Sequence, residues 1–370
     1  MRTRALVVLV AMMIIAACTN TGVTQSPSAP ATSGPSGSVA PDGSVAPSGP
    51  ATSDVKIGMV TDIGQLEDKS FNEYSWKGVQ DGAAAIGAPP PTNIVTADTA
   101  DYKANIQSLV DDDYNVIVTV GFLIGTDTRA AALVNPEIQF FGVDQFVAAP
   151  EPPNYQGILF AEAQPGYLAG IVAASISKTA VIGAVGGRDD VPPVYAYING
   201  YRNGAAFVNP AIKVLVNYTQ DFNDPAKGQA AAQAMIGQDA DVIFQVAGLT
   251  GAGALQAACA ANIWGIGVDV DQSKSLPNSA ACIVTSAEKK LQASVAAALE
   301  RFAADGMQGG AEGGNFFNDA KNDGIGLSPF TNVTIPADVQ AKIDAALEGF
   351  KDGSLDPCAP VACDGPNPET

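Results

Sequence analysis

The sequence NVIVTVG (115–121) is followed by a helical pattern over 126–134 and then by IQFFGVD (138–144). Both quoted runs are apolar along nearly their whole length, which is typical of strands buried on both faces of a parallel sheet. A helix between two such strands is the repeating unit of an α/β sheet. These residues therefore predict a layered α/β fold with a parallel sheet.

The same alternation extends in both directions along the chain. Before residue 115, the pattern predicts strands at 55–61 and 92–97 and helices at 70–87 and 102–110. After residue 144 it restarts, with strands at 179–187, 212–218, 241–248 and 264–271 and helices at 194–208, 224–237, 251–262 and 289–306. Two such halves predict two Rossmann-like lobes joined by a hinge, with a ligand cleft between them.

The alternating pattern divides the chain from residue 55 onward into two lobes, a late segment and a tail. We expect an N-terminal lobe at 55–160 and a C-terminal lobe at 161–285, with 286–352 supplying late helices and crossover segments to both. A C-terminal tail follows at 353–370.

Residues 1–17 have the features of a secretory signal: two arginines, a short apolar run and small residues before Cys18. The ending resembles the bacterial lipoprotein box, which implies cleavage before Cys18 and lipid attachment to its thiol. An ordinary signal with an incidental cysteine is the alternative. Residues 18–54 are rich in Ser, Pro and Gly, so we expect a disordered tether. The expected location is the extracytoplasmic face of the cell membrane, held there by the lipid.

The composition excludes several classes of function. The 370 residues include 19 Lys and Arg against 38 Asp and Glu, a net charge of −19, which argues against nucleic acid as a partner. The chain contains no histidine, so His-dependent nucleophiles and His metal ligands are excluded. We expect no metal, no cofactor and no catalytic residue. A carboxylate-based nucleoside hydrolase is the alternative.

Four cysteines remain beyond Cys18, and an envelope location permits disulfides between them. We favour the pairs Cys259–Cys282 and Cys358–Cys363, the second of which would close a short loop in the tail. Free buried thiols are the alternative.

Polar and aromatic residues gather where the predicted strands end and the next elements begin. They are Asp62, Asp144, Gly248 and Asp269 at strand ends, Phe71 and Asn72 at the first helix, Phe222 in a loop, and Lys289 at the start of the last long helix. Aromatic rings stack on planar groups, and carboxylates accept hydrogen bonds from hydroxyls. The set predicts a flat ligand that carries hydroxyl groups. Helix caps, core aromatics and a solvated lysine are the alternative roles.

TDIGQLEDKSFNEYSWKG (61–78) resembles the opening signature of the basic-membrane-protein family, the PnrA-like purine-nucleoside-binding lipoproteins of ABC transporters. Further blocks agree in order, among them INGYRNGAAFVNP (198–210), DFNDPAKG (221–228) and GIGVDVDQ (265–272), and the resemblance covers about residues 55–352. It implies the type I periplasmic-binding-protein fold and a monomer that delivers a purine nucleoside to an ABC permease.

The resemblance also implies roles for single residues. The base would lie between Phe71 and Phe222, Asp144 would contact the base, and Asp269 would contact the ribose hydroxyls. Gly248 would let the backbone approach the ligand. Asp62 and Asn72 belong to the first signature.

Two positions stay open in this assignment. Lys289 would form a hydrogen bond with the ribose or hold Asp269 in place. Its neighbour Lys290 could be the residue in this role instead. The block AEAQ (161–164) has Glu162 as its one acid, which weakens the case for a second acid at that point.

The same fold could bind a free sugar, a base or a signalling molecule instead of a nucleoside. A surface antigen without a small ligand is a further alternative, although it would leave the clustered carboxylates at the strand ends without a purpose.

Overall fold

The computed structural model describes residues 53–148, 152–310 and 314–367. The expected signal segment, Cys18 and nearly all of the expected tether lie outside these residues. Within the described ranges, no helix has both the length and the apolar character that a membrane span requires.

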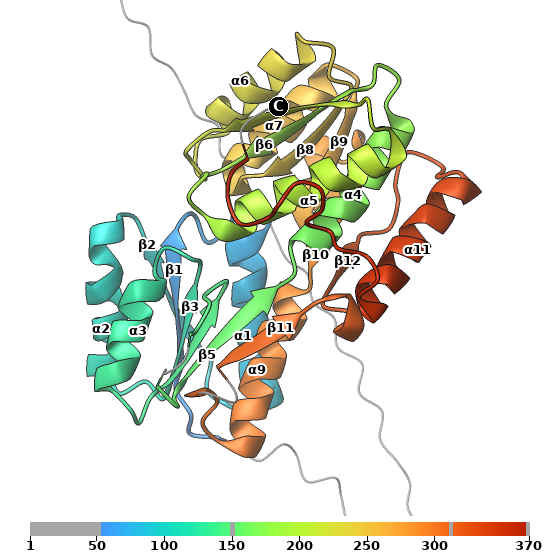
Figure 1. Ribbon diagram of the computed structural model, residues 1–370. Helices are drawn as coiled ribbons and strands as arrows, with labels where there is room; N and C mark the ends of the chain where they lie inside the picture. Colours follow the sequence, from blue (N-terminus) through green and yellow to red (C-terminus); the bar gives the residue numbers. More distant parts are fainter. Residues whose placement is uncertain (1–52, 149–151, 311–313, 368–370) are drawn as a thin grey trace, which may run out of the picture. The chain divides into compact units, whose positions relative to one another are not determined.

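The first lobe contains a six-stranded sheet in which all neighbouring strands run parallel (Figure 1). Its order is β11-β5-β4-β3-β1-β2, with bounds β1 (Ile57–Ile63), β2 (Thr92–Thr96), β3 (Val116–Val120), β4 (Gln139–Val143), β5 (Tyr155–Phe160) and β11 (Asn315–Asn318). Strand β11 comes from late in the chain yet lies beside β5.

Helices cover both faces of this sheet. They are α1 (Phe71–Ala85), α2 (Tyr102–Asp111), α3 (Gly125–Val134) and α9 (Leu291–Asp305). Successive strand residues point to opposite faces, so Met59 packs in the core under α1 and α9 and Val60 packs in the core under α2 and α3. The apolar character of β1 on both faces follows from this double cover.

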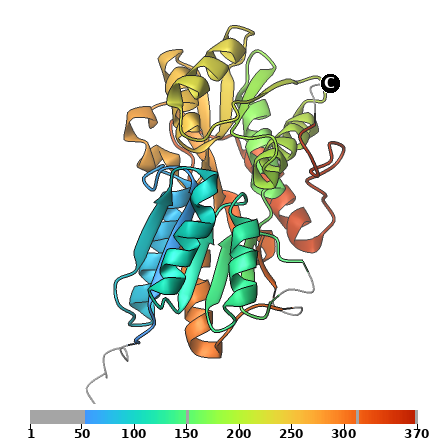
Figure 2. The ribbon, with the colours of Figure 1, turned by 90° about the vertical axis from the view of Figure 1, so that its left-hand side faces the viewer.

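The second lobe repeats the plan with order β12-β10-β9-β8-β6-β7. Its strands are β6 (Val181–Gly186), β7 (Lys213–Tyr218), β8 (Val242–Val246), β9 (Trp264–Asp269), β10 (Ile283–Lys289) and β12 (Ile325–Leu327), and its helices are α4 (Ala163–Ile176), α5 (Pro192–Val208), α6 (Pro225–Ile236), α7 (Gly248–Ala260), α8 (Gln272–Ser275) and α11 (Ala337–Asp352). Strand β12 is the one antiparallel member, paired with β10. Figure 2 shows the two lobes from the side.

Strand β10 is an element that the sequence analysis does not expect. All seven of its residues are buried, although Thr285, Ser286 and Glu288 are polar. Their polar groups find partners: Thr285 Oγ1 donates to Ser328 O at 2.7 Å, for example. The prediction that Lys289 starts a helix is wrong, because Lys289 ends β10 and α9 begins at Leu291.

The chain passes between the lobes three times, and we call these segments the crossings: 160–163, 289–291 and 318–325. They are hydrogen-bonded to one another. Ala161 N donates to Asn318 O at 2.9 Å, and Lys290 N donates to Gly324 O at 3.0 Å. The three crossings therefore form one connected strip of backbone.

Helices α4 and α5 of the second lobe touch through glycines. A Cβ on Gly204 would lie 1.9 Å from Tyr167 O, and one on Gly170 would lie 2.1 Å from Tyr201 O. No side chain fits there, so the backbones meet directly. This contact fixes α5, whose first turns line the cleft described below.

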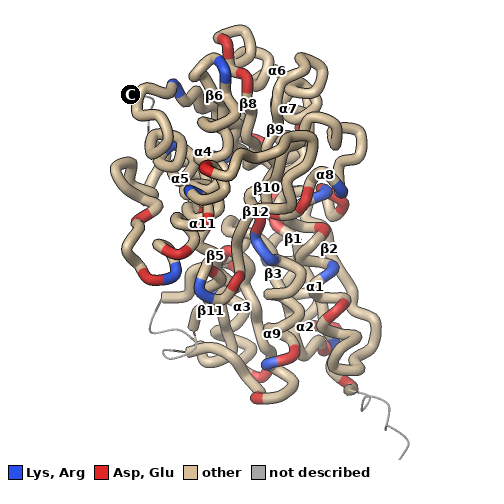
Figure 3. The backbone as a smooth tube through the Cα atoms, turned by 90° about the vertical axis from the view of Figure 1, so that its right-hand side faces the viewer, with Lys and Arg blue, Asp and Glu red and all other residues tan. Residues whose placement is uncertain are grey.

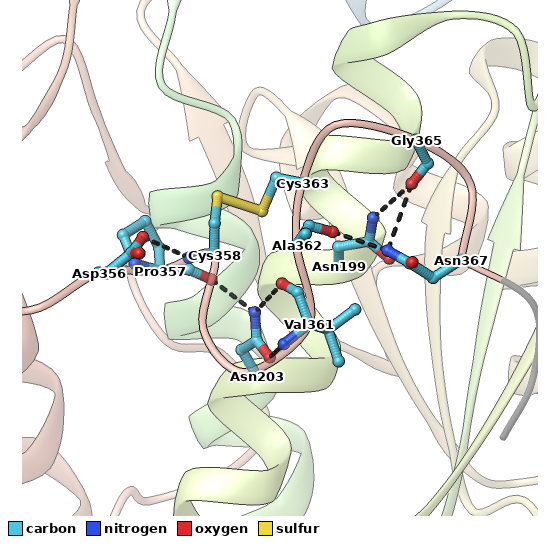
Figure 4. Close-up of a disulfide and its surroundings, with 10 residues drawn as sticks. All are labelled: Asn199, Asn203, Asp356, Pro357, Cys358, Val361, Ala362, Cys363, Gly365 and Asn367. Carbon is cyan, nitrogen blue, oxygen red and sulfur yellow. Dashed lines mark hydrogen bonds between the residues drawn. A yellow bond between two sulfur atoms is a disulfide. The ribbon is translucent and has the colours of Figure 1, made fainter.

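Both disulfides favoured from the sequence are present, Cys259–Cys282 and Cys358–Cys363. The second closes a tail that lies on α5 (Figure 4). Asn203 Nδ2 donates to Pro357 O and to Val361 O, each at 2.8 Å, and Asn203 Oδ1 accepts from Val361 N at 2.9 Å. The tail thus satisfies a buried amide on α5.

Replacing Gly204 with Ala is expected to destabilise the second lobe. The added methyl group meets the Tyr167 carbonyl, so α4 and α5 must separate, at a cost of about 1–3 kcal/mol in the free energy of unfolding. Urea denaturation measures the change. Gly326→Ala is the matched control because a Cβ there meets nothing within 4 Å. Equal stabilities of the two variants would contradict direct backbone contact.

Candidate functional site

A cleft of about 730 Å³, its solvent-open mouth included, lies at the carboxyl ends of the strands of both sheets. All eight residues that the sequence analysis selects for ligand binding line it: Asp62, Phe71, Asn72, Asp144, Phe222, Gly248, Asp269 and Lys289. They come from both lobes, as expected where parallel sheets face each other.

Asp144 and Asp269 occupy equivalent places in the two lobes. Asp144 directly follows β4 and Asp269 is the last residue of β9, and both lie in the left-handed region, with φ of 60° and 63°. This conformation is unfavourable for residues other than glycine, and such strain occurs often at functional sites. Both carboxyl groups are buried, and burial raises the pKa of each above its ordinary value.

Lys289 carries the charge at the base of the cleft. Its Nζ lies 2.6 Å from Asp144 Oδ2 and 3.0 Å from Glu162 Oε1, and only 2% of its side chain is exposed. Burial by itself lowers the pKa of Lys289, but the charges of Asp144 and Glu162 outweigh it, so the pKa is raised and the ammonium stays charged. The rings of Phe71 and Tyr197 lie 5.2 and 5.7 Å from the ammonium, within cation–π range.

Between the two neighbouring lysines, the structure places Lys289 in the cleft. Lys290 pairs with Glu288, and 45% of its side chain is exposed. Its face of the protein also carries the Lys274–Asp271 pair, and Figure 3 shows basic and acidic residues adjacent to one another around α8. Lys289 donates to Asp144 rather than to Asp269, so it does not hold Asp269 by a direct hydrogen bond.

Two buried acceptor atoms at the cleft have no hydrogen-bond partner among the described residues, Asp144 Oδ1 and Asn72 Oδ1. A buried acceptor without a partner costs about 1–3 kcal/mol. Both residues line the cleft. The cleft therefore offers hydrogen-bond acceptors to a ligand that brings N–H or O–H donors.

Asp269 meets the first lobe through Ser70. Ser70 Oγ donates to Asp269 Oδ2 at 2.7 Å, and Asp68 holds the loop by accepting from Ser70 N at 2.9 Å. Burial raises the pKa of Asp68 to about 7. Sequence reasoning missed Asp68, although an aspartate just before a helix is a capping signal that could have found it.

Asp62 organises the lip of the cleft on the first lobe. Its Oδ1 accepts from Ile63 N at 2.6 Å and from the Tyr102 hydroxyl, and its Oδ2 accepts from Leu123 N at 2.8 Å. Burial raises the pKa of its carboxyl group, against the effect of these hydrogen bonds. Asp62 thus ties two loops together as well as lining the cleft.

The two aromatics reach the cleft from different lobes. Phe71 is the first residue of α1, and Phe222 lies in the loop between β7 and α6. A Cβ on Gly187 would lie 2.1 Å from the Phe222 ring, so a glycine is needed there for the ring to fit. Gly248 opens α7 with φ of 55°, and Phe222 O accepts from Thr250 N at 3.2 Å. The second aromatic is therefore held by backbone contacts.

Comparisons with known proteins agree with this architecture. The family described as "ABC transporter substrate-binding protein PnrA-like" matches residues 55–349. The ABC transporter nucleoside-binding protein BmpA of Lactococcus lactis subsp. cremoris is 35% identical over 232 residues, which cover 60% of this chain and 65% of that relative. The matched chain thus spans just under two thirds of that protein's length.

Two further proteins extend the comparison. Basic membrane protein A1 of Borrelia garinii subsp. bavariensis is 30% identical over 294 residues, covering 78% of this chain and 84% of the relative. A solute-binding protein of an ABC transporter system from Aeropyrum pernix K1 shares the fold with a TM-score of 0.74 at 23% identity, over 82% of this chain and 92% of that one. The chain belongs to the PnrA-like family of ABC transporter substrate-binding proteins, and its lobes form the type I periplasmic-binding-protein fold that the sequence predicts.

Proposed function

We propose that this protein captures a purine nucleoside in the cleft and delivers it unchanged to an ABC permease. The observation that carries the proposal is that Phe71 and Phe222 line the same cleft as Asp144, whose Oδ1 has no hydrogen-bond partner among the described residues. The name of the Lactococcus relative, a nucleoside-binding protein, supports the same ligand class.

Each part of a nucleoside has a suitable partner in the cleft. A base stacked on an aromatic ring gains about 1–3 kcal/mol. In this proposal Asp144 accepts from a base N–H through Oδ1, which has no partner among the described residues, and Asp269, which also lines the cleft, accepts from ribose hydroxyls. A neutral ligand also suits the site, because Asp144, Glu162 and Asp269 already outnumber the one ammonium of Lys289.

We further propose that a lipid on Cys18 anchors the protein to the outer face of the cell membrane, with residues 18–54 as the tether. The two disulfides are consistent with an oxidising, extracytoplasmic location. An anchored binding protein would stay close to its permease while its lobes remain free to bind ligand.

Calorimetry with adenosine, guanosine, inosine and free ribose tests the ligand. We expect at least one nucleoside to bind with a Kd of about 1 μM or below, and ribose to bind far more weakly because it has no base to stack. The nucleoside should be recovered intact, whereas release of free base would favour the hydrolase. Absence of binding by all three nucleosides would overturn the proposal.

Replacing Phe71 with Leu tests the stacking. The leucine keeps most of the apolar volume but has no aromatic face, so nucleoside affinity should fall about tenfold, as the loss of a stack worth 1–3 kcal/mol implies. Phe146→Leu is the control, since Phe146 is 67% exposed and does not line the cleft. An unchanged Kd for Phe71→Leu would show that the base lies elsewhere.

Replacing Cys18 with Ser tests the anchor. The hydroxyl cannot take up the lipid thioether, so the protein should move from the membrane fraction to the soluble fraction on cell fractionation. Cys358→Ser is the control for loss of a cysteine as such. Membrane retention of Cys18→Ser would contradict lipid attachment at this residue.

A further inference from the structure

Glu162 lies in the first crossing, between the end of β5 and the start of α4. Lys289 lies at the start of the second crossing, between β10 and α9. Their ion pair, 3.0 Å between Oε1 and Nζ, therefore joins two of the three segments that connect the lobes. Glu162 does not itself line the cleft, whereas Lys289 does.

The Glu162–Lys289 pair is buried among other charged groups. Only 11% of the Glu162 side chain is exposed. Lys289 on β10 and Asp144 after β4 act on the Glu162 carboxyl group, Glu162 acts on Tyr197 of α5, and Asp269 on β9 acts on Lys289. Burial raises the pKa of Glu162 to about 7; Lys289 opposes this rise and Asp144 adds to it.

Asp144, which follows β4, and Glu162, in the first crossing, share the one ammonium of Lys289. Asp144 lines the cleft, its Oδ2 accepts from Lys289, and its Oδ1 has no hydrogen-bond partner among the described residues, so under the proposed function Oδ1 would accept from the ligand. With Glu162 ionised, Lys289 is held between two carboxylates, and its direction is fixed. Without that second charge, Asp144 alone would attract Lys289, and the ammonium would cover an oxygen that the ligand needs.

We propose that Glu162 is a positioning residue for ligand binding: it holds the Lys289 ammonium between two crossings and so keeps Asp144 available to the ligand. This inference rests on the proposed nucleoside function for its first test but not for its second. It gives a role to the one acid of the AEAQ block, for which the sequence analysis finds little support.

The sign of the pH effect follows from the ionisation of Glu162. Near pH 8 Glu162 is mostly ionised and positions Lys289, and near pH 6 it is mostly protonated and does not. Wild-type affinity should therefore fall as the pH falls. Asp68, which interacts with Asp269, has a pKa of about 7 as well, so its ionisation also changes over this pH range. Asp68 is present in the variant and in the wild type, so the ratio of their Kd values at each pH isolates the effect of Glu162.

The first test is adenosine calorimetry with Glu162→Gln, which keeps the shape and removes the charge. At pH 8 we expect the Kd to be about tenfold or more above wild type, and at pH 6 within about threefold, because wild-type Glu162 is then neutral too. Glu288→Gln is the matched control: it also neutralises a buried glutamate that pairs with a neighbouring lysine, but outside the cleft, and should leave the Kd within about twofold.

The outcomes separate the two proposals. A Glu162→Gln variant with a wild-type Kd at both pH values, or with the same loss at both, overturns the positioning role and leaves the nucleoside function standing. If wild-type protein binds no nucleoside, the proposed function fails, and the second test decides the role of Glu162.

The second test needs no ligand. A 1H–15N spectrum of the ligand-free protein should show a protected ammonium signal for Lys289, identified by its loss in Lys289→Arg. In Glu162→Gln at pH 8 this signal should shift or broaden, since a neutral amide oxygen replaces one of its two carboxylate partners, while Glu288→Gln should leave it in place. An unchanged signal in Glu162→Gln overturns the inference.

Discussion

The buried ammonium of Lys289 is the constraint around which the cleft and the crossings are arranged. An isolated charge in such a place would be too costly, and it is tolerated because Asp144 and Glu162 lie at 2.6 and 3.0 Å. Asp144 follows β4 of the first lobe, Glu162 lies in the first crossing, and Lys289 ends β10 of the second lobe. The ion pairs of this one lysine therefore link the two lobes and a segment that connects them. Losing both acids would leave an uncompensated buried charge, whereas losing one would leave the ammonium paired with the remaining carboxylate.

The acids outnumber the cation, and this imbalance gives the site its chemical character. Asp144, Glu162 and Asp269 all have pKa values raised by burial, and Asp144 and Asp269 also hold left-handed backbone conformations. Both features destabilise the unliganded protein. The first of them, the burial of the carboxyl groups, is relieved by a ligand that supplies hydrogen-bond donors without adding negative charge. These features are the physical basis for proposing a neutral ligand that carries hydrogen-bond donors.

The sequence allowed most of the lobes to be predicted, because their strands are apolar on both faces and their helices alternate with them. Strand β10 was not predicted, because its polar residues do not have the apolar pattern of a buried strand. Their partners, among them Ser328 for Thr285 and Asp144 for Lys289, are brought to them only by the fold. The same failure put Lys289 at a helix start. The sequence also offered little reason to assign Glu162 to the site. Its partner, Lys289, is far away in the sequence, and the two residues come together only when the crossings fold.

The rigidity of each lobe decides where movement can occur. In the second lobe, α4 and α5 meet backbone to backbone at Gly170 and Gly204, which leaves little freedom for sliding within the layer. A change in the angle between the lobes must then be absorbed by the crossings. Glu162 and Lys289 lie on two of them, and Lys289 also lines the cleft. Under the proposed function, ligand contact and lobe movement would act on the same side chain, Lys289, and a charge change at Glu162 would reach the ligand through that one residue.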